Sequence, residues 1–109
     1  QLAKIAKSFV GLVHQNKSQF AAFLFPVRMQ IYSTPQALST YPQDEFKKLF
    51  DGLNVPHFDP LPALRQKAPS IASQDLLYDH CHYRVEGNQI VSDILVEWLT
   101  KDSIVPKLQ

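Results

Sequence analysis

The chain has 109 residues, enough for one small domain. Hydrophobic residues make up 45% and charged residues 19%, which is typical of a globular domain and argues against a disordered one. Its net charge is +1, with 11 basic and 10 acidic residues dispersed along the sequence, so neither a nucleic-acid-binding surface nor a polybasic membrane patch is expected. The single cysteine, Cys81, excludes an internal disulfide, and no apolar run approaches the ~20 residues of a membrane span.

The first part of the chain is predicted to hold a helix, a buried strand and a loop. Residues 2–16 form an amphipathic helix in this prediction, because apolar side chains recur there at helical spacing. The run from Phe20 to Val27 is short, continuously apolar and rich in aromatic residues, which is typical of a strand buried on both faces of a parallel sheet. Residues 28–43 contain polar groups and prolines, so we expect mostly loop there, with at most a short helical turn.

The middle of the chain is predicted to hold two helices separated by a short strand. The first of these helices opens with Pro42 and the acidic residues after it, which are favourable in a first turn, and it stops at Gly52 and Asn54. Residues 55–59 are predicted to form the strand and residues 61–68 a short helix. A loop is expected to follow at residues 69–74.

The last helix is predicted to run from Gly87 or Asn88 to Thr100, with Asn88 as its N-cap. Strands alternating with helices of this length favour an α/β domain with a parallel sheet. Two strands alone make a poor sheet, because an edge and much apolar surface would stay unpaired. We therefore expect further strands from outside these 109 residues, and we expect the chain alone to be marginally stable or to aggregate.

The densest group of chemically active side chains lies between Asp79 and Gly87, in a loop before the last helix. Open α/β sheets place active sites at the carboxyl edge of the sheet, where this loop is expected. Asp79 and His82 are three residues apart, so a tight loop can bring the carboxylate to one ring nitrogen of the histidine. That contact would hold the imidazole in the tautomer that accepts a proton from a serine.

The Asp79-x-x-His82 block, followed by Gly87 and an apolar helix, resembles the last block of SGNH/GDSL serine hydrolases. The order of strand, helix and short strand before it is similar to the C-terminal half of that family, and Pro26 to Tyr32 resembles a turn found in a subgroup. The resemblance implies a three-layer α/β/α domain with a parallel sheet, of which residues 1–109 form the C-terminal part with about two strands and three to four helices. It implies an esterase for acyl esters of lipids or carbohydrates, with His82 as general base, Asp79 orienting it, and no cofactor.

The nucleophile and the oxyanion hole of such an enzyme are missing from this sequence. No serine lies in a Gly-Asp-Ser or Gly-x-Ser-x-Gly context, and no asparagine lies in the family's Gly-x-Asn-Asp setting. The serine is therefore expected from the N-terminal half of the same domain or from a partner chain. The 109 residues alone are expected to lack esterase activity.

Four further polar residues lie near the ends of the predicted strands. Arg28 and Tyr32 follow the first strand at its carboxyl end, which makes them candidates for lining a substrate pocket; two solvated loop residues are the alternative. His57 and Asp59 are expected to satisfy hydrogen bonds at the end of the second strand.

Two other functions are compatible with the sequence. The loop that begins at Asp79 would merely cap the last helix if the chain were a non-catalytic α/β interaction module. A small metal-binding module is the other alternative, with ligands from Asp79, His80, Cys81 and His82. Zinc sites usually take four ligands from separated segments, and the other histidines of the chain are isolated, so we expect no metal site.

Overall fold

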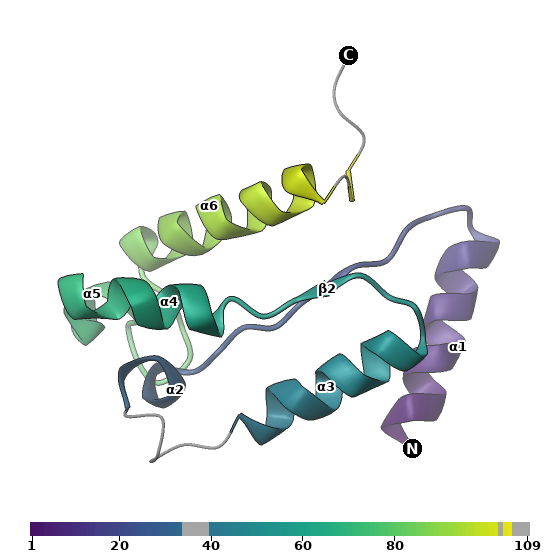
Figure 1. Cartoon of the computed structure of the whole chain (residues 1–109), viewed down its shortest axis with the longest axis horizontal. Coiled ribbons are helices and arrows are strands. Elements are labelled where there is room, and N and C mark those ends of the chain that lie inside the picture. Colours follow the sequence, from purple (N-terminus) through teal and green to yellow (C-terminus); the bar gives the residue numbers. More distant parts are fainter. Residues whose placement is uncertain (34–39, 103, 106–109) are drawn as a thin grey trace.

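The computed structural model describes residues 1–33, 40–102 and 104–105 and consists mainly of helices around a two-stranded parallel ribbon (Figure 1). The helices are α1 (Leu2–Gln15), α2 (Arg28–Tyr32), α3 (Tyr41–Gly52), α4 (Leu61–Lys67), α5 (Ser73–Leu76) and α6 (Val85–Lys101), with a 3₁₀ turn at Ala68–Ser70. The strands are β1 (Ala22–Phe23) and β2 (His57–Phe58), with Ala22 opposite His57 and Phe23 opposite Phe58.

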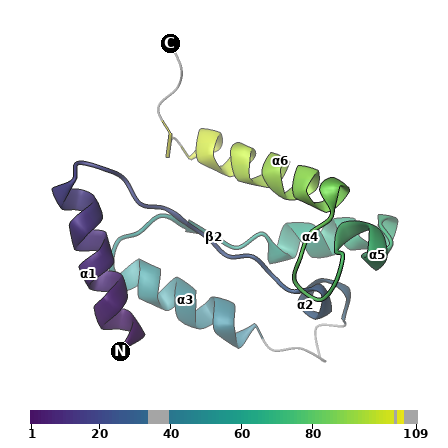
Figure 2. The ribbon, with the colours of Figure 1, turned by 180° about the vertical axis from the view of Figure 1, so that it is seen from behind.

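Helices cover both faces of the ribbon, with α3 on one side and α6 on the other (Figure 2). Successive residues of a strand point to opposite faces. Ala22 accordingly packs with Val10 of α1 and Phe50 of α3, whereas the ring of Phe23 lies 6.3 Å from that of Trp98 in α6. The structure therefore confirms a small α/β unit with parallel strands.

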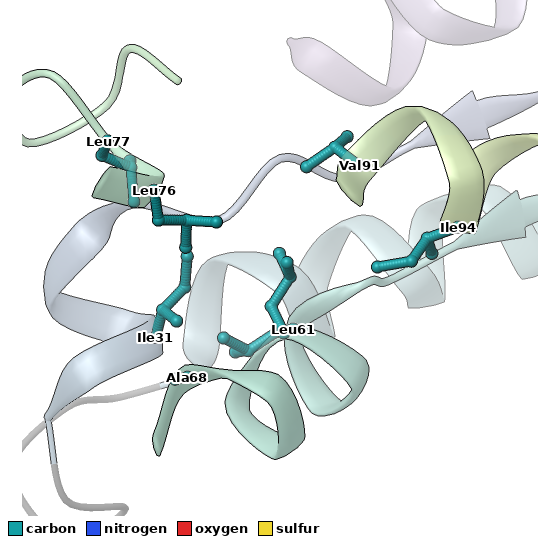
Figure 3. Close-up of a cluster of buried hydrophobic side chains, with 8 residues drawn as sticks. Ile31, Leu61, Ala68, Leu76, Leu77, Val91 and Ile94 are labelled. Carbon is teal, nitrogen blue, oxygen red and sulfur yellow. The ribbon is translucent and has the colours of Figure 1, made fainter. Parts of the chain in front are cut away.

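The larger of two buried clusters forms where α2, α4, α5 and α6 meet (Figure 3). Its members are buried aliphatic side chains: Ile31, Leu61, Leu64, Ala68, Leu76, Leu77, Val91 and Ile94. Leu76 and Leu77 immediately precede the loop that carries Asp79 and His82, and Val91 lies in the helix that follows it. The cluster therefore holds the chain on both sides of that loop.

The smaller cluster lies between α1, α3 and the ribbon and consists of Val10, Ala22, Phe50 and Val55. Only one side of α1 takes part in it. A neighbouring face of α1 carries an exposed apolar stripe, which we call the α1 stripe: Leu2, Ile5, Phe9 and Leu12, each between 50% and 60% exposed. Spacings of three, four and three residues place these side chains on one face of the helix. Within the described residues, only the ring of Phe9 has an aromatic partner, Phe20, at 5.1 Å between ring centroids, and all four side chains stay at least half exposed.

A buried pair of glutamines ties α2 to α3. The Gln30 and Gln43 side-chain amides donate to each other's carbonyl oxygens, with both N···O distances 2.9 Å. The Gln30 Oε1 atom also accepts the backbone N–H of Val27, 3.1 Å away, which satisfies a free donor at the start of α2. The short helical turn expected in residues 28–43 is thus confirmed as α2, while the part of that predicted loop at 34–39 lies outside the described residues.

The predicted helices at residues 2–16, 42–53 and 61–68 are confirmed, but the predicted strands are longer than the observed ones. Each strand keeps two residues, because the ladder extends only where the two segments face each other. Pro56 and Pro60 bracket β2 and have no backbone N–H to donate. The predicted loop at residues 69–74 is also partly wrong, since the 3₁₀ turn and the start of α5 occupy most of it.

The N-cap predicted for the last helix is wrong. The helix begins at Val85 and its N-cap residue is Arg84, so Asn88 lies inside the first turns rather than before them. Its backbone N–H donates to the Arg84 carbonyl, 2.7 Å away, and its side-chain amide donates to the Tyr83 carbonyl, 3.3 Å away. The helix starts early because the chain enters it directly from the antiparallel bridge between Leu77 and Tyr83.

Candidate functional site

The residues between Leu77 and Arg84 form a closed loop, which we call the site loop (residues 77–84). An antiparallel bridge pairs Leu77 with Tyr83 at its base. The Tyr78 N–H donates to the His82 carbonyl at 2.7 Å. Asp79 and His82 therefore occupy the tip of a hairpin-like turn, which is the tight geometry that their spacing predicts.

The Asp79 carboxylate accepts three hydrogen bonds within this turn. One oxygen, Oδ2, lies 2.7 Å from Nδ1 of His82. The other, Oδ1, accepts the backbone N–H groups of Cys81 at 2.8 Å and of His82 at 2.9 Å. The expected contact between the carboxylate and the imidazole is therefore present, and the backbone holds the carboxylate in place for it.

These hydrogen bonds also set the charge of the pair. The backbone N–H groups of Cys81 and His82, followed by the His82 side chain, hold the pKa of Asp79 well below its usual range. An ionised carboxylate at Nδ1 favours the tautomer with a proton on that nitrogen, which leaves Nε2 free to accept one. The His82 side chain is 74% exposed, and among the described residues Nε2 has no hydrogen-bond partner. The arrangement is that of an oriented base open to an incoming proton donor.

Contacts from distant parts of the sequence fix the site loop at the carboxyl end of β1. The Arg28 backbone N–H donates to the His80 carbonyl at 2.8 Å, and Nη2 of Arg28 donates to the Leu77 carbonyl at 2.6 Å. The Tyr83 hydroxyl donates to the Pro26 carbonyl at 2.8 Å, and burial raises the pKa of Tyr83 well above its usual range, so the hydroxyl stays a neutral donor. The loop thus lies where the sequence analysis expects it.

Arg28 and Tyr32, the two candidates for substrate binding, both use polar atoms to hold backbone carbonyls. Besides the contact of Arg28 with Leu77, the Tyr32 hydroxyl donates to the carbonyl of Ile71 at 3.1 Å. The Nε atom of Arg28 is buried without a hydrogen-bond partner among the described residues. Both side chains therefore support the site loop and its surroundings, and a contact with substrate stays a prediction.

Gly87 is required by a close approach within the fold. A Cβ atom at this position would collide with the carbonyl group of Leu76 and would lie 3.2 Å from the ring of Tyr83. The structure places this glycine in the first turn of α6, against Leu76, the last residue of α5. Any larger residue would push α6 away from this loop.

His57 and Asp59 make structural contacts, as the sequence analysis expects. The ring of His57 has Nδ1 2.9 Å from the Val55 carbonyl and Nε2 3.6 Å from the Asp51 carboxylate. Asp59 forms an ion pair with Lys47 at 2.9 Å. Neither residue shares a contact with the site loop in these interactions.

Within the described residues, no serine hydroxyl is brought to His82. None of their serine hydroxyls is hydrogen-bonded to the imidazole; those of Ser18 and Ser70, for example, donate to nearby carbonyls of their own turns. Ser39 and Ser103 lie outside the described residues. The site therefore holds a base and its orienting acid, without an observed serine.

The site loop also brings three potential metal ligands together. An oxygen of Asp79, a ring nitrogen of His80 and Sγ of Cys81 all lie within 4.8 Å of one another, the one such group found in the part of the chain that the structure describes. The Cys81 thiol is free and exposed, and its Sγ lies 3.6 Å from Nδ1 of His82. Partial desolvation and the negative charge of Asp79 raise the pKa of Cys81.

Comparison of the chain with protein-family models, with curated proteins and with solved structures finds no match in any of the three. Within the described residues, no helix combines the length and the apolar character needed to cross a membrane.

Proposed function

We propose that this chain is the C-terminal part of a serine esterase of the SGNH/GDSL type, with a three-layer α/β/α domain, and that it supplies the catalytic aspartate and histidine. The observation that carries the proposal is the 2.7 Å contact between Asp79 and Nδ1 of His82, with Nε2 of the same ring open to solvent. The substrates are acyl esters of lipids or carbohydrates, and no cofactor takes part. Water or a second alcohol accepts the acyl group.

The proposed mechanism begins with a serine supplied from outside the described residues. Its hydroxyl proton moves to Nε2 of His82 while its oxygen attacks the ester carbonyl. Asp79 keeps the ring oriented and stabilises the imidazolium that forms. His82 then returns the proton to the departing alcohol, which leaves an acyl-serine ester. A water molecule, deprotonated by His82 in the same way, attacks that ester. His82 then returns the proton to the serine oxygen, and the acid and the free serine are released.

The uncovered surfaces suggest where the serine-bearing segment binds. Edge strands that stay unpaired in native proteins usually carry prolines or charges that prevent pairing with another strand. Strand β2 has both features: Pro56 and Pro60 lie at its ends, and the ion pair of Asp59 with Lys47 lies beside it. The segments that lead into and out of β1 expose apolar side chains instead, namely the α1 stripe and Phe25, which is 58% exposed. We therefore place the N-terminal half of the domain, or a partner chain, on the β1 side of the ribbon.

A fluorophosphonate probe tests the proposal, because it reacts covalently with activated serines. The probe is applied to the complete assembly, in which the serine-bearing segment is present, and to the 109-residue chain alone. We expect one labelled serine in the assembly and none in the chain alone. His82→Ala should slow the labelling by about a thousandfold, whereas His80→Ala, a change of the neighbouring histidine, should leave it unchanged. Equal labelling of the His82→Ala variant and the unmodified protein would contradict the proposal.

A further inference from the structure

Three consecutive residues of the site loop bring potential metal-binding atoms close together. The Asp79 oxygen, the His80 ring nitrogen and the Cys81 sulfur all lie within 4.8 Å of one another. Tetrahedral zinc, with ligand bonds of about 2.0–2.3 Å, holds its ligand atoms about 3.3–3.8 Å apart. Binding of such an ion therefore requires these side chains to rotate until their ligand atoms reach that spacing.

The backbone of this part of the loop is already held in place. The Arg28 N–H binds the His80 carbonyl at 2.8 Å, and the Cys81 N–H binds the Asp79 carboxylate at 2.8 Å. Both contacts use backbone atoms of His80 and Cys81. The Cys81 thiol also lies 3.6 Å from Nδ1 of His82, a contact that it must leave to bind an ion. Because Cys81 is exposed, an ion can reach the cluster from solvent.

The chemistry of the donors selects the ion. A thiolate, an imidazole and a carboxylate together suit Zn²⁺ and Co²⁺, whereas Mg²⁺ and Ca²⁺ prefer sites made of oxygens. The Asp79 carboxylate is ionised, since its pKa lies well below the usual range. The Cys81 thiol loses its proton to water as the sulfur–metal bond forms. Three protein ligands leave the fourth position of a tetrahedral ion to a water molecule.

We propose that Asp79, His80 and Cys81 form a binding site for a zinc-like divalent ion, and that the ion competes with His82 for the Asp79 carboxylate. The same carboxylate now lies 2.7 Å from Nδ1 of His82. An ion that draws Asp79 toward His80 and Cys81 removes the group that orients the base. This regulatory consequence rests on the proposed function, whereas the binding of the ion does not.

Cobalt titration of the 109-residue chain tests the binding site directly. A thiolate bound to Co²⁺ gives a charge-transfer absorption band in the near ultraviolet, and we expect this band to saturate at one ion per chain. Cys81→Ser should abolish the band, and both Cys81→Ser and His80→Ala should weaken Zn²⁺ binding at least about tenfold. His14→Ala, at an exposed and isolated histidine of α1, is the matched control and should bind normally. Far-ultraviolet circular dichroism verifies that each variant keeps its helices.

The absence of the absorption band, its survival in Cys81→Ser, or an equal loss of it in His14→Ala would contradict the proposed metal site.

Competition between the ion and His82 is tested in the complete assembly by the rate of fluorophosphonate labelling. Zn²⁺ should slow this rate at least about tenfold in the unmodified protein and much less in Cys81→Ser, each compared with its own metal-free rate. Zinc binding without slower labelling would overturn the competition. Absence of labelling in the metal-free assembly would contradict the esterase function while leaving the cobalt result intact.

Discussion

The two buried clusters of this molecule differ in how fully the surrounding helices shield apolar side chains from solvent. The larger cluster, between α2, α4, α5 and α6, is closed by its own helices and holds both ends of the site loop. The smaller cluster has four members, and the helix beside it, α1, leaves an apolar stripe in solvent. The difference indicates that contacts within the described residues position Asp79 and His82, whereas the side of the ribbon near α1 keeps exposed apolar side chains.

The largest expected difference between the two regions is in the free energy of unfolding after truncation of one leucine in each. Leu64 of the larger cluster is 1% exposed, and Leu12 of the α1 stripe is 57% exposed. Leu64→Ala removes buried contacts and leaves a cavity, so it should lower the free energy of unfolding by about 3 kcal/mol. Leu12→Ala should change it by less than about 0.5 kcal/mol. Urea unfolding followed by circular dichroism measures both, and equal losses would break the distinction between the two regions.

Two glycines sharpen the same comparison. Gly87→Ala places a methyl group against the Leu76 carbonyl, so α6 must shift and the free energy of unfolding should fall by about 2–3 kcal/mol. Gly11, in the middle of α1, has open space where an added methyl group would lie, and Gly11→Ala should raise the free energy of unfolding by about 0.5–1 kcal/mol. Thermal unfolding of the two variants should therefore shift in opposite directions. A stable Gly87→Ala protein would show that the contact between α6 and the site loop is looser than described.

The hydrogen bond of Tyr83 tests how firmly the site loop is attached to the ribbon. Tyr83→Phe removes the donor to the Pro26 carbonyl and should cost about 1 kcal/mol of unfolding free energy. Tyr78→Phe is the control, since Tyr78 is 72% exposed, and it should be nearly neutral. Hydrogen exchange of the loop amides measures the local effect. Unchanged protection in Tyr83→Phe would mean that the contacts made by Arg28 suffice to hold the loop.

The smallest expected effect on folding comes from the α1 stripe. Replacing Leu2, Ile5 and Leu12 together by glutamine should change the free energy of unfolding by less than about 1 kcal/mol, because these side chains are exposed. The same change should reduce self-association, which analytical ultracentrifugation detects, because exposed apolar patches drive association. Val96→Gln, at an exposed valine of α6, serves as the control. Equal association of the triple variant and the unmodified chain would show that the stripe is not a contact surface.

The sequence predicts those parts of the fold that depend on local patterns. Helical spacing of apolar residues places α1, and the proline and acidic residues after residue 41 place the start of α3. The strand lengths and the start of α6 cannot be predicted in this way, because they depend on which residues face each other across the ribbon and on the bridge between Leu77 and Tyr83. Local propensity gives way to tertiary contacts at these positions.

In the candidate site, too, local contacts could be predicted from the sequence and long-range contacts could not. The contact between Asp79 and His82 follows from a spacing of three residues in a tight loop. The roles of Arg28 and Tyr83 in holding that loop do not, since their partners Leu77 and Pro26 lie 49 and 57 residues away in the chain. The residues around Tyr83 in the sequence do not indicate that its side chain is partly buried.

The most direct test of the central claim compares ester hydrolysis by the complete assembly in three forms. p-Nitrophenyl acetate is the substrate, in buffer with a chelator, for the unmodified protein, His82→Ala and His80→Ala. We expect His82→Ala to lose activity by about a thousandfold with its circular dichroism unchanged, and His80→Ala to keep full activity. Equal activity of all three forms would contradict a catalytic role for the pair of Asp79 and His82, and the site loop would then serve only to anchor α6.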